Sequence, residues 1–406
     1  MKRIQTYIFI IFNTFCLLGC IGNERGGLQI PSLPSFDEKA RKEAALKMLS
    51  AAISSSPSNP ENFYKRANIY LASENFADGS TDIDQAIELD ANQNRYHLLK
   101  ALLLRGQKKP EKALEAAKRA EILKNTSPEL LTLLGDLYQQ IGQYGKASLY
   151  LAKSTQASPN NGETYYYSAL VTAKTDDSLT AIPLLEKALS LKPSFLPTYL
   201  TFSSLYTNSR QYPLALYYSE LGLKYHPKSG ELYLKRGITY QRIFKLDSAI
   251  FCYNRAIAFE PALYQASFNS GILFFKIRNY ASALGQFLHT KKYKPDFPEL
   301  NNLIGQCYEY TGNLEKAEEF YTIASTANPE DYRALNGLFS VKRKLMYGDS
   351  AMASYKNPYP DVQFKDEYIP DPRLKDTTTL KSIEIKVKPR IRMDTASKRL
   401  LNPLNN

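Results

Sequence analysis

The sequence predicts an all-α protein in which helix-turn-helix units are stacked along the chain. A small residue returns every 34 residues, without insertion or deletion, at Ala45, Gly79, Ala113, Ala147, Ala181, Ala215, Ala249, Ala283 and Ala317. Twelve residues after most of these positions a proline follows, at Pro57, Pro159, Pro193, Pro227, Pro261, Pro295 and Pro329. Self-similarity at such a period is typical of a solenoid, and in most units a proline at this place ends the second helix. The alternative is a plain helical bundle in which small residues recur by coincidence.

Two further repeat columns, meaning residues that recur at the same place every 34 residues, lie in the first helix of each unit. Twelve residues before the small residue lies a second residue with little side chain: Ala67, Ala101, Gly135, Ala169, Ser203, Gly237, Gly271 or Gly305. A large residue follows three positions later, for example Tyr70 or Phe274. The small residue lets two helices approach closely and the large one fills the seam.

This pattern resembles the tetratricopeptide repeat, and it covers eight full units from about Pro60 to Asp331. The resemblance implies a right-handed α-solenoid. One unit cannot bury its own apolar face, so the two ends need caps. Phe36 to Ser54 reads as an N-terminal half repeat, and Arg333 to Leu345 as a C-terminal capping helix. We therefore expect the solenoid over residues 36–345.

The N-terminus predicts export and lipid attachment. Lys2 and Arg3 precede the apolar run 8–18, and the segment ends Leu17-Leu18-Gly19-Cys20. A cationic start, a short apolar core and small residues at the cut are typical of a signal peptide, here residues 1–19. Its last four residues resemble the bacterial lipobox, which implies acylation (palmitate) of Cys20. Alternatively, an ordinary signal peptidase cuts the chain and Cys20 is incidental. Residues 20–35, rich in Gly and Pro, then read as a flexible tether.

The same resemblance to bacterial lipoproteins, including the Bacteroidetes type, gives an expected location. Ile21 stands where an aspartate retains many lipoproteins in the inner membrane, so the outer membrane is favoured. Glu24 is opposed by Arg25, so the acidic cluster that directs some lipoproteins to the cell surface is lacking. The periplasmic face is therefore expected, with the cell surface as the alternative.

The composition and the scattered polar residues point away from chemistry. The net charge is +12, but an exported chain rarely meets nucleic acid, and no compact basic cluster with stacking aromatics occurs. His97, His226 and His289 fall at unrelated repeat positions, which suggests no metal site or catalytic dyad. We expect no enzyme activity, no cofactor and no small-molecule substrate. Cys252 and Cys307 lie two repeats apart, so we expect two unpaired, buried thiols.

The resemblance implies a concave groove lined by the first helices, where ligands contact the second, fifth, ninth and twelfth residues of each unit. Several of these residues are large and apolar in the middle and late units: Tyr166, Leu170, Leu200, Leu234, Ile238, Phe268, Ile272 and Phe275. Such a patch, if exposed, favours an extended or helical peptide ligand. The alternative is that superhelical curvature buries these side chains between units.

Residues 346–406 lose the helical periodicity. Ile383, Ile385 and Val387 alternate with charged residues, which reads as a strand without a partner or as part of a disordered basic tail. Together these features predict a membrane-anchored envelope scaffold or adaptor for protein or peptide partners, in a secretion, motility or cell-wall complex. A surface-exposed binding or adhesion lipoprotein is the alternative.

Overall fold

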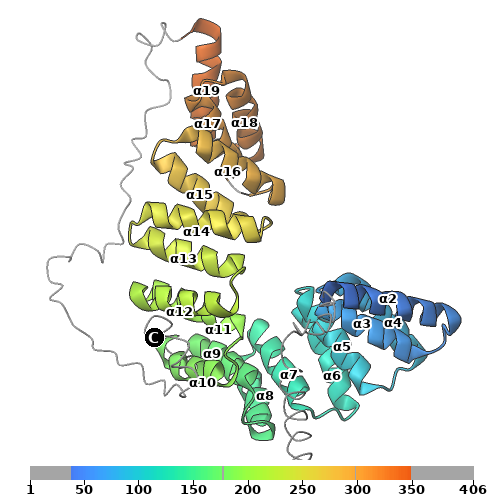
Figure 1. The fold of residues 1–406 in the computed structure, drawn as a ribbon. Coiled ribbons are helices and arrows are strands. Elements are labelled where there is room, and N and C mark those ends of the chain that lie inside the picture. The colour runs from blue at the N-terminus through green and yellow to red at the C-terminus, as the bar shows by residue number, and fades with distance from the viewer. Residues whose placement is uncertain (1–37, 176–177, 298, 349–406) are drawn as a thin grey trace, which may run out of the picture. The chain divides into compact units, whose positions relative to one another are not determined.

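The computed structural model describes residues 38–175, 178–297 and 299–348. The predicted signal peptide, Cys20, the tether, Asp176, Asp177 and all but the first residues of the tail lie outside the described residues. The chain divides into two compact units, residues 1–300 and 301–406. The described residues contain helices and turns with no strand, which confirms the all-α solenoid class (Figure 1).

The described part of the first compact unit begins with α2 (Glu38–Ser55) and continues as helix pairs. The early pairs are α3 (Pro60–Ala72) with α4 (Phe76–Leu89), α5 (Asn94–Gly106) with α6 (Pro110–Ile122), and α7 (Pro128–Gln140) with α8 (Tyr144–Ala157). The later pairs are α9 (Gly162–Thr175) with α10 (Ile182–Leu191), α11 (Leu196–Asn208) with α12 (Tyr212–Tyr225), α13 (Gly230–Arg242) with α14 (Leu246–Phe259), and α15 (Tyr264–Lys276) with α16 (Tyr280–Tyr293). A 3-10 turn, η1 (Ser178–Ala181), precedes α10.

The second compact unit contains the last pair and a closing helix. They are α17 (Leu300–Tyr310), α18 (Leu314–Ala327) and α19 (Tyr332–Tyr347). Tyr321 of α18 is buried against two glycines, Gly305 of α17 and Gly337 of α19. These glycines leave room for the ring, so the closing helix packs on α18 as another first helix would.

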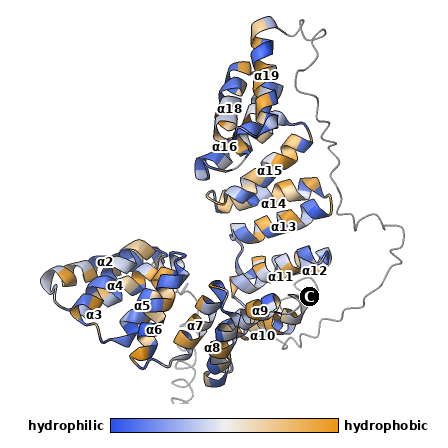
Figure 2. Cartoon of the chain, turned by 180° about the vertical axis from the view of Figure 1, so that it is seen from behind, coloured by the Kyte–Doolittle hydropathy of each residue, from blue (hydrophilic) through white to orange (hydrophobic). Residues whose placement is uncertain are grey.

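Each pair packs along the small-residue seam that the period predicts. Ala249 and Ala283 are fully buried, and the ring of Phe287 lies against Gly271 with no space for a further carbon. Figure 2 shows hydrophobic and hydrophilic stretches alternating around the helices, as expected when one stripe of each helix faces its neighbours. The seams contribute to several buried apolar clusters along the first compact unit.

The turn inside a unit needs one residue with a left-handed backbone. Gly142 (φ 77°) occupies this place in the third unit, and Gly312 (φ 84°) in the eighth. Elsewhere a larger residue adopts the same conformation, such as Lys108 (φ 58°) and Arg278 (φ 60°). L-residues adopt this region at a cost of about 1 to 2 kcal/mol, so the turn geometry is imposed by the packing of the two helices it joins.

Within the described part of the chain, no helix is both long enough and apolar enough to span a lipid bilayer.

Candidate functional site

Two of the four fifth-place residues of the predicted groove are buried, whereas the ninth-place residues are half-buried. Tyr166 of α9 and Leu234 of α13 are only 9% and 8% exposed. The Tyr166 ring meets Phe195 edge-on at 5.2 Å between ring centroids, and its hydroxyl lies 3.3 Å from the Thr201 hydroxyl. Tyr166 therefore bridges the fourth and fifth units. The burial of Tyr166 and Leu234 agrees with the alternative stated above, in which the groove side chains are buried between units.

Phe268 of α15 is half-buried by a similar arrangement. Its ring lies 4.5 Å from that of Phe297, measured between centroids, and 6.1 Å from that of Phe287. Phe195 and Phe297 both occupy the last place of their 34-residue units, in the connection to the next unit. An aromatic residue at this place therefore covers the fifth-place ring of its own unit.

The remaining predicted groove residues stay half-exposed. Leu170 and Leu200 pack at the edge of the buried cluster around Phe202, and Ile238 at the edge of the cluster around Tyr253. On α15, Ile272 is half-buried and the Phe275 ring lies 5.3 Å from that of Tyr280. These side chains keep accessible apolar surface on the first helices of the fourth to seventh units. Whether they bind a partner stays a prediction.

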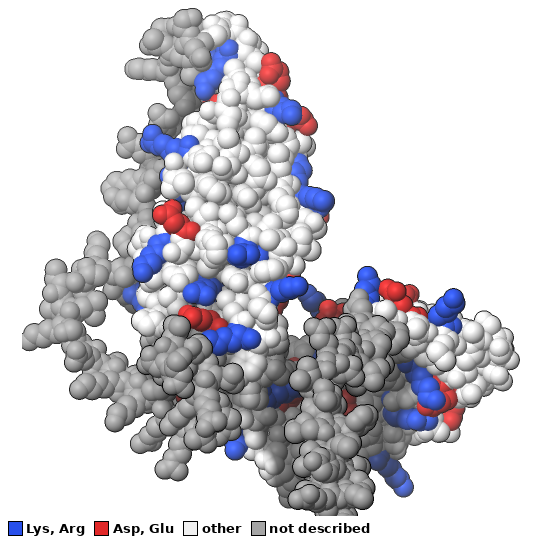
Figure 3. Space-filling view, viewed as in Figure 1, with Lys and Arg blue, Asp and Glu red and all other residues white. Residues whose placement is uncertain are grey.

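Charged side chains are sparse over part of the first compact unit. On the face seen in Figure 3, single Lys, Arg, Asp and Glu side chains are spread around a broad uncharged area over α14 to α16. The early units carry ion pairs such as Arg95 with Glu61 at 2.7 Å, where the guanidinium also lies over the Tyr64 ring at 5.0 Å.

A polar cluster links the first helices of three successive units. Asp136 of α7 is 3% exposed and accepts hydrogen bonds from Gln140 at 2.9 Å and from Arg105 of α5 at 3.3 Å. Arg105 also reaches the Tyr167 hydroxyl of α9 at 3.5 Å. Burial raises the pKa of Asp136, although Gln140 and Arg105 oppose the shift. The carboxylate is occupied by neighbours, so the cluster ties units together instead of offering a free ligand group.

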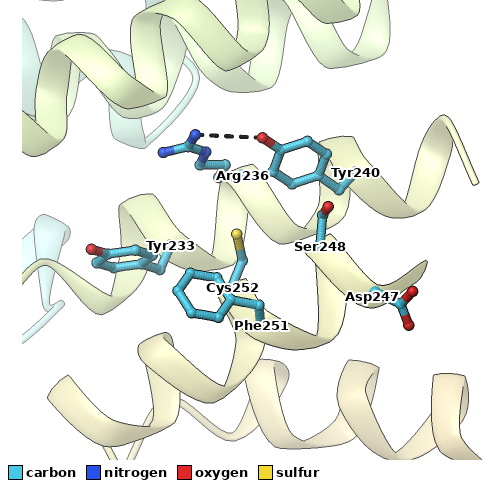
Figure 4. A pocket seen from close by; sticks show the side chains of 7 residues that line it. All are labelled: Tyr233, Arg236, Tyr240, Asp247, Ser248, Phe251 and Cys252. Carbon is cyan, nitrogen blue, oxygen red and sulfur yellow. Dashed lines mark hydrogen bonds between the residues drawn. The ribbon is translucent and has the colours of Figure 1, made fainter. Parts of the chain in front are cut away.

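A pocket of about 450 Å³ opens beside α13 and α14 (Figure 4). The side chains that line it are Tyr233, Arg236, Tyr240, Asp247, Ser248, Phe251 and Cys252. Figure 4 shows the Cys252 sulfur pointing to the side where Arg236 lies, and Asp247 at the edge of the group. Sequence inspection missed this pocket because its residues do not share a repeat column with the predicted groove. The sequence does not single out Arg236, because its repeat place holds the charged Arg66 and Lys100 as well as the apolar Leu134 and Phe202.

The thiols lie where the sequence suggested. Cys252 and Cys307 are both unpaired and buried, which confirms the prediction. Burial raises the pKa of Cys252 to about 11 and that of Cys307 to about 12. Among the described residues, no group of histidine, cysteine and acidic side chains is arranged to hold a metal ion.

Stacked helix pairs with a repeated small-residue seam define the class of protein, an α-solenoid. Family models described as tetratricopeptide repeat match residues 64–128, 128–161, 230–263 and 298–331. The chain therefore contains tetratricopeptide repeats, as the residue pattern predicted.

Several curated proteins are distantly similar in sequence. The chain is 22% identical over 292 residues to the BBSome complex member BBS4 of Bos taurus, which covers 62% of this chain and 55% of that protein. It is 26% identical over 145 residues to the general transcriptional corepressor ssn6 of Schizosaccharomyces pombe, covering 35% of this chain and 13% of that protein. It is 23% identical over 299 residues to the TPR repeat-containing protein YpiA of Bacillus subtilis, covering 71% and 69%. The chain thus spans little more than half of the bovine relative and a small part of the yeast one.

Solved structures give similar, low-level matches. A chain of the APC/C hetero-tetramer Cut9–Hcn1 matches with a TM-score of 0.49 and 16% identity, over 76% of this chain and 60% of that chain. The Pseudomonas aeruginosa pilF structure matches with a TM-score of 0.46 and 14% identity, over 53% and 97%. PilW, a type IV pilus biogenesis factor, matches with a TM-score of 0.44 and 17% identity, over 53% and 98%.

Proposed function

We propose that this protein is a lipid-anchored scaffold or adaptor of the bacterial envelope that binds protein or peptide partners along the first helices of its solenoid. The observation that carries the proposal is the accessible apolar surface left by Leu170, Leu200, Ile238, Ile272 and Phe275 on successive first helices. A solenoid offers an extended surface of this kind because each unit contacts only its neighbours. A peptide that inserts apolar side chains at intervals fits such a surface.

The anchor in this proposal is Cys20. Its support is the lipobox-like sequence Leu17-Leu18-Gly19-Cys20 behind a short apolar run with a cationic start. Two or more acyl chains bind a membrane far more stably than one, so acylation would hold the protein at the surface without a spanning helix. We place the protein at the periplasmic face of the outer membrane, because residues 21–25 lack both an aspartate after the cysteine and an acidic cluster.

Partner binding is tested with a matched pair of variants on one helix pair. Ile272→Ser removes a half-exposed apolar side chain of the first helix α15, and Leu288→Ser removes one that is 37% exposed on the second helix α16. A photo-crosslinking residue at Lys276 of the full chain reports contacts in living cells. We expect a crosslinked partner that Ile272→Ser loses and Leu288→Ser keeps, with the melting temperature little changed in both variants.

Three other outcomes would contradict the proposed binding face. If Leu288→Ser loses the partner and Ile272→Ser keeps it, the second-helix face binds and the proposed face is wrong. If Ile272→Ser lowers the melting temperature by several degrees without changing the crosslinks, its side chain belongs to the core. If no partner crosslinks to this face, the scaffold proposal fails at this site.

The anchor is tested separately. Metabolic labelling with a palmitate analogue should modify the wild-type chain and leave Cys20→Ala unmodified. Protease added to intact cells should then spare the protein if it faces the periplasm. Digestion on intact cells would contradict the periplasmic placement and favour the surface-exposed lipoprotein.

A further inference from the structure

The first unit shows how a seam arginine is satisfied in this solenoid. Arg66 of α3 donates from Nε to Asp82 Oδ2 at 2.7 Å and from Nη2 to Asp82 Oδ1 at 2.7 Å. Its Nη1 also donates to the Ser50 hydroxyl at 2.9 Å. Both charged side chains are mostly buried, with 19% and 6% exposed. A buried guanidinium at this place is therefore neutralised by a two-point carboxylate contact.

Arg236 occupies the same repeat place in the sixth unit, without the carboxylate. Arg236 and Cys252 lie five periods of 34 residues after Arg66 and Asp82. The thiol of Cys252 thus stands where the first unit has its carboxylate. Burial raises the pKa of Cys252 to about 11, so this thiol is uncharged at neutral pH. In the first unit the seam arginine therefore faces a carboxylate, whereas in the sixth unit the residue at the same place is an uncharged thiol.

The remaining contacts of Arg236 do not replace that carboxylate. Its Nη2 lies 3.4 Å from the Tyr240 hydroxyl and 3.8 Å from Glu220, whose side chain is 61% exposed. Its Nε is buried and has no hydrogen-bond partner within the described residues. A buried N–H that donates to nothing is costly, because it has lost water without gaining an acceptor. The guanidinium is therefore held in place with donor capacity left unused.

The pocket described above is lined by the Arg236 side chain. It is also lined by Cys252, by the rings of Tyr233, Tyr240 and Phe251, and by the Ser248 hydroxyl. Rings around a single cation suit a ligand that carries one negative charge on an apolar body. Asp247 at the edge and Glu220 nearby disfavour a more highly charged anion such as phosphate.

We propose that the Arg236 pocket binds a carboxylate, supplied by a partner protein or by a small organic acid, whose oxygens accept from the guanidinium as Asp82 does from Arg66. The site is separate from the groove of the proposed function. Arg236 is two residues from both Leu234 and Ile238, so it projects from the opposite side of α13. The proposal therefore stands or falls independently of the groove.

The test uses the full chain labelled with 15N-arginine and follows the side-chain Nε–H resonances by NMR. The probe is benzoate, and its neutral isostere benzamide is the control. We expect benzoate to shift the Arg236 resonance saturably while the Arg66 resonance stays in place. The shift should vanish in Arg236→Gln, which also assigns the resonance. Because Arg236 is 24% exposed, this variant should fold, and its melting temperature checks that it does.

A second pair of variants tests the comparison between units. Cys252→Asp supplies from within the chain the carboxylate that Asp82 supplies to Arg66, and Cys252→Ser is the matched uncharged control. We expect Cys252→Asp to weaken benzoate binding by about tenfold or more, and Cys252→Ser to keep it within about twofold. If Cys252→Asp does not fold, Arg236→Gln still decides the proposal.

Two short peptides then distinguish the sources of the carboxylate. One has a free C-terminus and no acidic side chain, and the other has an amidated C-terminus and one internal glutamate. A shift of Arg236 with either peptide supports a protein ligand, and a shift with benzoate alone supports a small organic acid. The proposal is overturned if benzamide acts like benzoate, if inorganic phosphate binds more tightly than benzoate, or if a folded Cys252→Asp binds benzoate as wild type does.

Discussion

A methyl group added at Gly271 should report how tightly the seam between α15 and α16 is packed. A Cβ at this position would lie 2.6 Å from Phe287 Cε1, 2.7 Å from Cδ1 and 3.2 Å from Cζ. Phe287 is fully buried, so its ring has little room to move away. Gly271→Ala therefore forces either the ring or the two helices to shift.

The expected magnitude combines two opposing terms. Alanine is favoured over glycine inside a helix by about 1 kcal/mol. Overpacking a buried site costs about 1 to 3 kcal/mol, and contacts below 3 Å to a fully buried ring put this site near the upper end. The net destabilisation of Gly271→Ala should be about 2 kcal/mol. For a unit of this size that corresponds to a fall in melting temperature of about 4 to 8 °C.

Gly285 of α16 is the matched control. A Cβ built there meets nothing within 4 Å, so Gly285→Ala adds only the helix preference and should stabilise by about 1 kcal/mol. Thermal melts followed by circular dichroism compare the two variants, and hydrogen exchange of α15 and α16 locates the change, because repeat arrays can unfold in parts. Equal stabilities for Gly271→Ala and Gly285→Ala would refute the idea that the small-residue column is set by close packing.

The remaining predictions concern the turns, the buried acid and the thiols. Gly142→Ala should cost about 1 kcal/mol in denaturant melts, because φ is 77° and no atom within 4 Å adds a clash; an unchanged midpoint would contradict this. The raised pKa of Asp136 means that the folded state holds its proton more strongly, so this group adds stability as the pH falls toward about 4. The stability of Asp136→Asn relative to wild type should therefore be greater near pH 7 than near pH 4, and the opposite trend in urea melts would show that the shift has the wrong sign. Cys252 and Cys307 should resist alkylation at about pH 8 until the chain unfolds, because burial keeps both thiols protonated; rapid modification of either peptide by mass spectrometry would count against their burial.

The fold could be predicted because the seam residues are constrained by contacts that recur in every unit. Ala249 and Ala283 are fully buried because each stands where two helices of one pair meet. Ala45 has the same place in the period but is only half-buried, and the sequence before it lacks the repeat columns of a first helix. The half repeat inferred from the missing columns accounts for this exposure. A period thus predicts which residues face a neighbouring helix within the array.

The candidate site was less predictable, because periodicity places a residue on one side of a helix without saying what covers it. Tyr166 and Phe268 share a repeat place, and each is covered by an aromatic residue from the connection to the next unit, Phe195 and Phe297 respectively. These two residues follow the helical segments, where the hydrophobic period no longer applies. The depth of the fifth-place residues therefore depends on the connections, which helix patterns do not describe.

The repeat also makes one unit a reference for another, which a protein without repeats does not offer. Arg66 and Arg236 stand in equivalent helical surroundings, so the difference between them is set mainly by the residue opposite, Asp82 or Cys252. Neither repeat column is regular enough to be noticed in the sequence. Counted from Pro60, the seventh place of a unit holds Arg66 and Arg236 but also Leu134, and the twenty-third place holds residues as different as Asp82 and Cys252. Only the geometry of the first unit shows that the two places face each other closely enough for a two-point contact. In a solenoid, departures from the repeat are therefore best judged against the unit where the same place has its partner, and by that standard the Nε of Arg236 is a buried donor without the carboxylate that Arg66 contacts.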